Sequence, residues 1–211
     1  MARVYCQRCN RPEKVCLCAS ISKQSNTRTL IIFQHDDEQK KPLSTVPLIQ
    51  QGLSGVEVLN GLRFDREKCF SLLAKHGACS PLLLYPESLS DDEEHLVLDL
   101  SDLASPLLKS LQQYDSLVIL DGTWRNTREL VLVNTWLQSL PTLALLNAGK
   151  SRYRIRKSTH EFSLSTIEAV AKVLPLLDEN IDSETLLKPF EKMIDQQIQY
   201  MGEEVFLRNY R

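Results

Sequence analysis

An unbroken apolar run, Leu117-Val118-Ile119-Leu120, is the feature that most limits how this chain can fold. It is β-branched at its centre and has no polar break, which is typical of a strand buried on both faces of a parallel sheet. Asp121-Gly122-Thr123-Trp124 follows directly, and a helical pattern begins at Arg125. Ligands bind at the carboxyl ends of parallel strands, so these four residues form a candidate site. The alternative is a plain turn, with a permissive Gly122 and Thr123 as helix cap.

Strand-like runs alternate with helical patterns along the rest of the chain. Further strands are expected at 29–35, 56–59, 80–85, 96–100 and 142–147, the fourth of these as a short edge strand. Helices are expected at 46–53, 65–76, 102–113, 123–139, 164–177 and 183–208. This alternation predicts an α/β fold, a mostly parallel sheet with helices on both faces. The sequence has no Gly-rich phosphate loop and no G-x-G-x-x-G after a strand, which argues against the usual dinucleotide fold.

The length and composition suit one domain with a small appendage. The chain has 211 residues, of which 43% are hydrophobic and 25% are charged, as in ordinary globular proteins. We expect residues 1–28 to form a cysteine-bearing knuckle and linker, and residues 29–211 to form the main domain. No apolar stretch is as long as a membrane span, and the first residues lack the apolar core of a signal peptide. We therefore expect a cytoplasmic protein with no membrane partner.

Four cysteines, Cys6, Cys9, Cys16 and Cys18, lie within thirteen residues in the pattern C-x2-C-x6-C-x-C. Thiolates at this spacing can converge on one tetrahedral ion, and zinc favours four sulfur ligands. A segment this short cannot build its own apolar core, so a bound metal would supply its folding energy. The pattern predicts a zinc knuckle, with redox-active cysteines or free thiols as the alternatives.

Two basic segments interrupt an otherwise acidic chain. Residues 1–28 carry six Lys or Arg and one Glu, and residues 150–157 carry five Lys or Arg and no acidic residue. Guanidinium groups bind phosphate, and an aromatic ring can stack on a base. We therefore expect RNA contacts in the second segment, at Lys150, Arg152, Tyr153, Arg154, Arg156 and Lys157. The alternatives are solvated surface and an exposed edge strand protected by charge.

Polar residues gather where other expected strands end or helices begin. His35 ends the first strand, as a ligand contact or as a hydrogen-bonding residue of the strand end. The hydroxyls of Ser44 and Thr45 precede a helix, where they could hold an anionic group or act as plain caps. Strand ends and helix starts also supply candidate ligand-binding residues, which are Pro86, Ser165, Thr166 and Glu168.

Four motifs, taken in order, resemble those of the DTW-domain family, which is named for Asp-x-Thr-Trp. They are the four-cysteine cluster, Asp121-Gly122-Thr123-Trp124, Tyr153-Arg154-Ile155-Arg156-Lys157 and Leu164-Ser165-Thr166-Ile167-Glu168-Ala169. The resemblance runs from Cys6 to the last helix. It implies a SPOUT-like α/β fold with a C-terminal knot. It also implies an enzyme that transfers a 3-amino-3-carboxypropyl group from S-adenosylmethionine (SAM) to N3 of a uridine in tRNA. Two features depart from the family pattern: the first strand ends in His35-Asp36 where the family commonly has His-Pro, and the segment 44–48 lacks the family's Arg.

The resemblance assigns the chemistry to the central motif and the cofactor to its surroundings. Asp121 is the candidate base for uridine N3, or else the counter-ion of the SAM amino group. Thr123 would position a polar group of SAM or support the turn, and Trp124 would stack on adenine or uracil or simply pack. The SAM pocket would be lined by Thr45, Pro86, Gly122, Ser165, Thr166 and Glu168. The sequence leaves open a SAM-dependent RNA methyltransferase, a non-enzymatic zinc-containing RNA-binding module, and the choice between monomer and homodimer.

Overall fold

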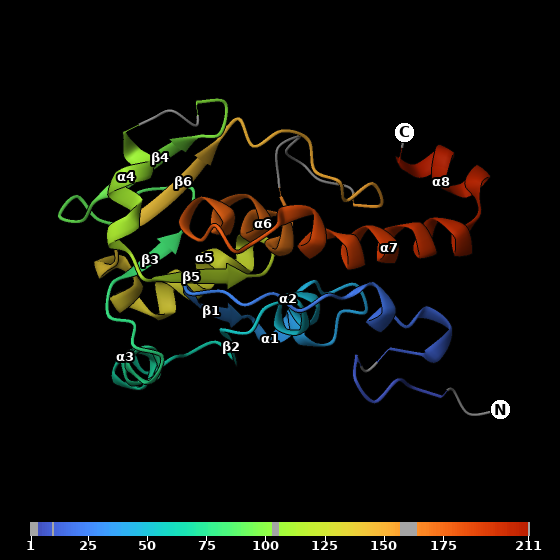
Figure 1. The fold of residues 1–211 in the computed structure, drawn as a ribbon, viewed down its shortest axis with the longest axis horizontal. Coiled ribbons are helices and arrows are strands. Elements are labelled where there is room, and N and C mark those ends of the chain that lie inside the picture. The colour runs from blue at the N-terminus through green and yellow to red at the C-terminus, as the bar shows by residue number, and fades with distance from the viewer. Residues whose placement is uncertain (1–3, 10, 103–105, 157–163, 211) are drawn as a thin grey trace.

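The computed structural model describes residues 4–9, 11–102, 106–156 and 164–210. Among these residues, six strands form one parallel sheet in the order β2-β1-β5-β3-β6-β4 (Figure 1). The strands are β1 (Thr29–Gln34), β2 (Val56–Asn60), β3 (Pro81–Leu84), β4 (His95–Asp99), β5 (Ser116–Asp121) and β6 (Thr142–Leu146). The expected α/β architecture is confirmed, and β4 is an edge strand as predicted.

Helices connect the strands. They are α1 (Asp36–Gln39), α2 (Val46–Gly52), α3 (Arg66–Lys75), α4 (Leu107–Ser110), α5 (Trp124–Val133), α6 (Thr166–Leu177), α7 (Ser183–Met201) and α8 (Glu203–Tyr210). Short 3-10 helices occur at η1 (Glu13–Val15), η2 (Cys18–Ser20), η3 (Leu111–Gln113) and η4 (Thr135–Ser139).

The strands bury both of their faces. In β1, Leu30 and Ile32 join one apolar cluster, while Ile31 and Phe33 join another. The first cluster includes residues of α2, α6 and α7, and the second includes residues of α3, α5 and η4. Because neighbouring side chains of a strand point to opposite faces, these helices cover opposite faces of the sheet. This double coverage explains why the central strands read as continuous apolar runs.

Three helices differ from the expected spans. The helix expected at 123–139 ends at Val133, since Asn134 leaves helical geometry and its side-chain amide donates to the carbonyls of Leu62 and Leu130. The helix expected at 183–208 breaks at Gly202, whose φ of 83° is in the region that favours glycine. The four-residue helix α1 was not expected. The helix expected at 102–113 begins at Leu107 and continues as η3, with residues 103–105 outside the described part.

The N-terminal knuckle packs against α7. Leu17 is 1% exposed and belongs to the same apolar cluster as α7. The Arg11 guanidinium donates to the sulfur of Met193 at 3.1 Å and to the carbonyl of Ser44 at 3.4 Å. These contacts fix the knuckle against the helical layer that also carries part of the candidate site.

Candidate active site and metal centre

Asp121 is a buried carboxylate held from two elements. It ends β5 beside Gln34 of β1 and is 7% exposed. Its Oδ2 accepts a hydrogen bond from Gln34 Nε2 at 2.8 Å, and its Oδ1 accepts one from the hydroxyl of Thr166, at the start of α6. The position of this carboxylate therefore depends on the sheet register and on the placement of α6.

The surroundings of Asp121 change its affinity for a proton. Burial raises the pKa of its carboxyl above the ordinary value, while the hydrogen bonds from Thr166 and Gln34 act in the opposite direction. Glu38 raises the pKa further and Lys41 lowers it. The net shift is upward, which makes this carboxylate a better proton acceptor than an exposed one.

The rest of the motif forms a tight turn into α5. A Cβ on Gly122 would lie 2.8 Å from the Cβ of Asn126, so the close approach of the chain requires glycine. The Thr123 hydroxyl accepts from the backbone N–H of Asn126 at 3.3 Å, as an N-cap does. Trp124 is 50% exposed. The motif is thus a capped turn, and it also forms part of a pocket wall.

Two pockets adjoin the motif. The first, called here the apolar pocket, has a volume of about 230 Å³. It lies at the ends of β3, β5 and β6, and apolar side chains dominate its wall. Its lining residues include Leu84, Tyr85, Pro86, Leu120, Trp124, Leu145 and Ala169. Of the predicted residues, Pro86 and Trp124 therefore lie together here.

The second, called here the polar pocket, has a volume of about 240 Å³. Charged and hydroxyl-bearing side chains dominate its wall, among them Glu38, Lys41, Ser44, Thr45, Asp121, Thr123 and Tyr153. Gly122, Arg156, Ser165 and Thr166 line both pockets, so the two pockets meet at the central motif. The structure therefore brings nearly all of the predicted motif and cofactor residues to one place.

The sequence reasoning missed four polar residues of this site: Gln34, which holds Asp121, and Glu38, Lys41 and Asn126. Glu38 Oε1 accepts from Lys41 Nζ at 2.6 Å and from the side-chain amide of Asn126 at 3.2 Å. Glu38 belongs to α1, which is too short to give a helical pattern. Its one local signal is the run of acidic residues after His35, where the imidazole Nδ1 caps α1 by accepting from the backbone N–H of Asp37.

Glu168 lies close to the site but lines neither pocket. Its carboxylate completes a capping box with Ser165 at the start of α6. It also accepts from the hydroxyl of Ser151 at 2.9 Å and from the backbone N–H of Arg152. In this structure, Glu168 ties the loop after β6 to α6.

The basic segment after β6 is a loop, so the alternative of an edge strand is wrong for residues 150–156. Arg152 makes ion pairs of 2.6 and 2.7 Å with Glu184 and Glu191 of α7, and Arg154 pairs with Asp195 of the same helix. These pairs fasten the loop to α7.

The remaining residues of this segment differ in placement. The Tyr153 hydroxyl donates to the carbonyl of Leu43 at 3.3 Å, and its ring packs edge-on against Phe190. Lys150 and Arg156 are exposed, and Arg156 also reaches both pockets. Lys157 lies outside the described residues.

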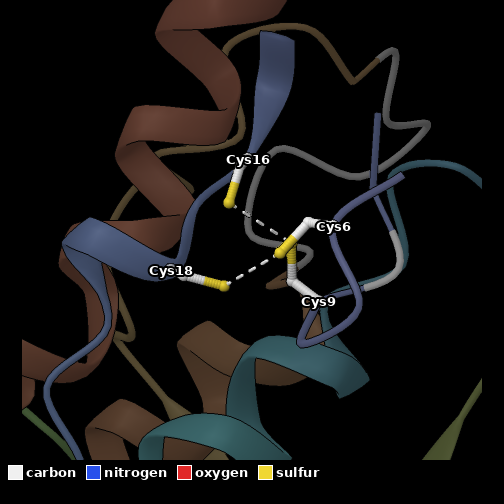
Figure 2. Close-up of side chains that lie close together, drawn as sticks. All are labelled: Cys6, Cys9, Cys16 and Cys18. Atoms are coloured by element: carbon white, nitrogen blue, oxygen red, sulfur yellow. Dashed lines mark hydrogen bonds between the residues drawn. The ribbon is translucent and has the colours of Figure 1, made fainter. Parts of the chain in front are cut away.

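The four N-terminal cysteines converge, as Figure 2 shows. Their sulfur atoms all lie within 4.8 Å of one another, with Cys6 and Cys18 at 3.6 Å and Cys9 and Cys16 at 3.7 Å. Tetrahedral zinc–sulfur bonds of about 2.3 Å place the sulfurs about 3.8 Å apart, so this set fits such an ion. Backbone N–H groups of Cys9 and Arg8 stabilise the Cys6 thiolate and lower the pKa of Cys6. The geometry matches a four-cysteine metal centre.

A parallel α/β sheet with paired pockets at its carboxyl edge, carrying the Asp-x-Thr-Trp turn, defines the class of this protein. The family model described as the DTW domain matches residues 3–198, and the chain belongs to that family. No helix in the described part of the chain has the length and apolar character needed to cross a membrane.

The chain is also similar to curated proteins named tRNA-uridine aminocarboxypropyltransferase 2. The protein of Mus musculus is 32% identical and that of Macaca fascicularis 31% identical, each over 98% of this chain and 70% of the relative. The protein of Drosophila melanogaster is 28% identical over 98% of this chain and 82% of its own length. No solved structure matches the chain.

Proposed function

We propose that this protein transfers a 3-amino-3-carboxypropyl group from SAM to N3 of a uridine in tRNA and releases methylthioadenosine. The observation that carries the proposal is the buried Asp121, which lines the polar pocket next to Gly122 and Thr166, two residues that line the apolar pocket as well. The names of the relatives support the reaction class. SAM would supply the aminocarboxypropyl group, and its sulfur would keep the electrons of the carbon–sulfur bond that breaks.

Asp121 is the proposed base. Bond formation at N3 requires loss of the N3 proton, which a carboxylate with a raised pKa accepts more readily. Gln34 and Thr166 hold the carboxylate by one hydrogen bond to each oxygen, which fixes its orientation toward a reacting atom.

The apolar pocket is the proposed adenosine site. Its wall suits a flat, weakly polar base and a thioether, and the half-exposed ring of Trp124 can stack on adenine. Pro86 and Gly122 are proposed to leave backbone close to the ligand, while Ser165 and Thr166 line the wall between the pockets, with their hydroxyls bonded to Glu168 and Asp121. Thr45 serves the polar pocket instead.

The four cysteines are proposed to bind structural Zn²⁺, which would hold the knuckle in its place on α7. Lys150 and Arg156 are exposed, and Arg156 also lines both pockets, so both are proposed as contacts for tRNA phosphates. Arg152 and Arg154 would join them only by exchanging the carboxylates of α7 for phosphate. Lys157 and the basic residues of the knuckle are proposed as further contacts for tRNA.

The proposal includes a SPOUT-like fold, supported by the parallel sheet and by pockets at the carboxyl ends of β3, β5 and β6. The C-terminal knot that the family resemblance implies belongs to the same proposal. We also propose a cytoplasmic location, because tRNA modification occurs where tRNA matures and works.

The direct test is to incubate the purified protein with SAM and unmodified tRNA, digest the RNA and weigh its nucleosides. We expect a uridine heavier by one aminocarboxypropyl group, together with released methylthioadenosine. A methylated nucleoside would instead identify an RNA methyltransferase. No modified nucleoside, from zinc-loaded protein that binds tRNA, would favour the non-enzymatic RNA-binding module.

A further inference from the structure

The polar pocket has a charge pattern that its role as a neighbour of the adenosine site does not explain. Two carboxylates, Glu38 and Asp121, and two cations, Lys41 and Arg156, line its wall. They come from α1, the end of β5, the α1–α2 segment and the loop after β6. Charges of both signs in one pocket match a ligand that itself carries both signs.

Glu38 and Lys41 form the fixed part of this pattern. The Glu38 side chain is 13% exposed, whereas that of Lys41 is 47% exposed, and their charged atoms lie 2.6 Å apart. Asn126 of α5 donates to the same Glu38 oxygen, so the carboxylate is positioned from the helix that carries the central motif. The half-exposed Lys41 can move toward an incoming anion, while the largely buried Glu38 is held by Asn126.

We propose that the polar pocket binds the zwitterionic aminocarboxypropyl end of the donor, through Lys41 and Arg156 to its carboxylate and through Glu38 to its ammonium. This inference rests on the proposed function. When a zwitterion binds, the Glu38–Lys41 ion pair is replaced by two new pairs, one between Glu38 and the ammonium and one between Lys41 and the carboxylate of the ligand. The net charge of the pocket stays unchanged. The largely buried carboxylate of Glu38 gains most from the exchange, since charges interact more strongly away from water.

The assignment also separates the roles of the two carboxylates. Asp121 is held by Gln34 and Thr166, whereas Glu38 is paired with the half-exposed Lys41. With Glu38 as partner of the ammonium, Asp121 is left to accept the N3 proton. Adenosine in one pocket and the zwitterion in the other place the bond that breaks at the shared wall, beside Asp121. Holding the chain in this way favours its transfer over transfer of the methyl group.

Calorimetric binding of two unreactive probes tests the inference. S-adenosylhomocysteine carries the zwitterionic chain, and methylthioadenosine lacks it. Lys41→Ala and Glu38→Gln should weaken binding of S-adenosylhomocysteine by about ten- to hundred-fold, as expected for a lost charge-assisted contact, and change methylthioadenosine binding by less than about two-fold. Lys40→Ala is the matched control, because Lys40 is exposed and lines neither pocket. It should leave both affinities unchanged.

The outcomes separate this inference from the proposed function. Unchanged binding of S-adenosylhomocysteine by Lys41→Ala, or an equal loss for both probes, would overturn the inference while the function stands. If the wild-type protein binds neither S-adenosylhomocysteine nor methylthioadenosine, both the inference and the proposed function are overturned. Lys41 is half-exposed and its loss leaves Glu38 bonded to Asn126, so this variant decides the question even if Glu38→Gln fails to fold.

Discussion

Replacing Asp121 by asparagine separates its chemical role from its structural one. The amide has the same shape, and its oxygen can still accept from Gln34 Nε2. Its NH₂ group can donate to the Thr166 hydroxyl, which only has to rotate, since a hydroxyl both donates and accepts. Both hydrogen bonds survive in neutral form, and the cost of burying a charge disappears. We expect the free energy of unfolding to change by no more than about 1 kcal/mol.

The same change removes the proton acceptor. Loss of a positioned base lowers rates by about 10²- to 10⁴-fold, so turnover of tRNA should fall by that factor while methylthioadenosine still binds. Asp121→Ala is the contrasting variant, because it leaves the buried donor of Gln34 and the partly buried donor of Thr166 without their acceptor. Each such loss costs about 1–3 kcal/mol, less for Gln34, whose amide also donates to Ser44.

The assay pairs nucleoside mass spectrometry with thermal melting of both variants. For a chain of this size, 1 kcal/mol corresponds to about 2–4 °C, so Asp121→Asn should melt within a few degrees of the wild type and Asp121→Ala clearly below it. Wild-type turnover in Asp121→Asn would refute the role of this carboxylate as base. Equal melting of the two variants would refute the hydrogen-bond argument.

Further predictions follow from other parts of the structure. Because burial raises the pKa of Asp121, kcat/KM should rise with pH above the ordinary aspartate range of about 3.8, and the residual rate of Asp121→Asn should lack this acidic limb. The folded state binds the Asp121 proton more tightly than the unfolded state does, so the contribution of Asp121 to stability should fall as pH rises from about 3.8 through the raised pKa. Denaturant unfolding of the wild type and of Asp121→Asn at several pH values measures the difference. Parallel stability curves for the two proteins would contradict the prediction. Cys9→Ser should release zinc, measured by metal analysis, and lower the melting temperature; an unchanged melting temperature would argue against a structural metal. Gly122→Ala should cost about 1–3 kcal/mol in denaturant melts, since its Cβ would meet a neighbour in α5 at 2.8 Å, and equal stability would show that α5 yields. Arg152→Ala combined with Arg154→Ala should weaken tRNA binding and flatten its salt dependence if these residues hold phosphate. If they only fasten the loop to α7, the tRNA affinity and its salt dependence should stay the same, and the free energy of unfolding should fall by at most about 1 kcal/mol for each ion pair.

The sequence by itself determined the class of fold and indicated one strand end as the candidate site. Strands buried on both faces need apolar residues at consecutive positions, so the apolar runs 30–33 and 117–120 could be recognised without any partner. The spacing of the cysteines is equally local, since a metal centre within thirteen residues leaves its ligands close together in the chain. Asp121 at a strand end followed from the same apolar run, and the family match confirms the resemblance to the DTW-domain family.

The tertiary structure decided what surrounds that motif. Glu38 and Asn126 are 88 residues apart in the sequence, and they meet because β1 and β5 pair in parallel and deliver α1 and α5 to one edge. Arg152 and Arg154 read as free cations until α7, more than thirty residues later, supplied their carboxylates. The hydrophobic pattern of a helix or strand depends on which of its own faces are buried, so it can be read from the local sequence. Which charges meet across a pocket depends on strand order and on how the helices pack, and periodicity along the chain carries no record of either.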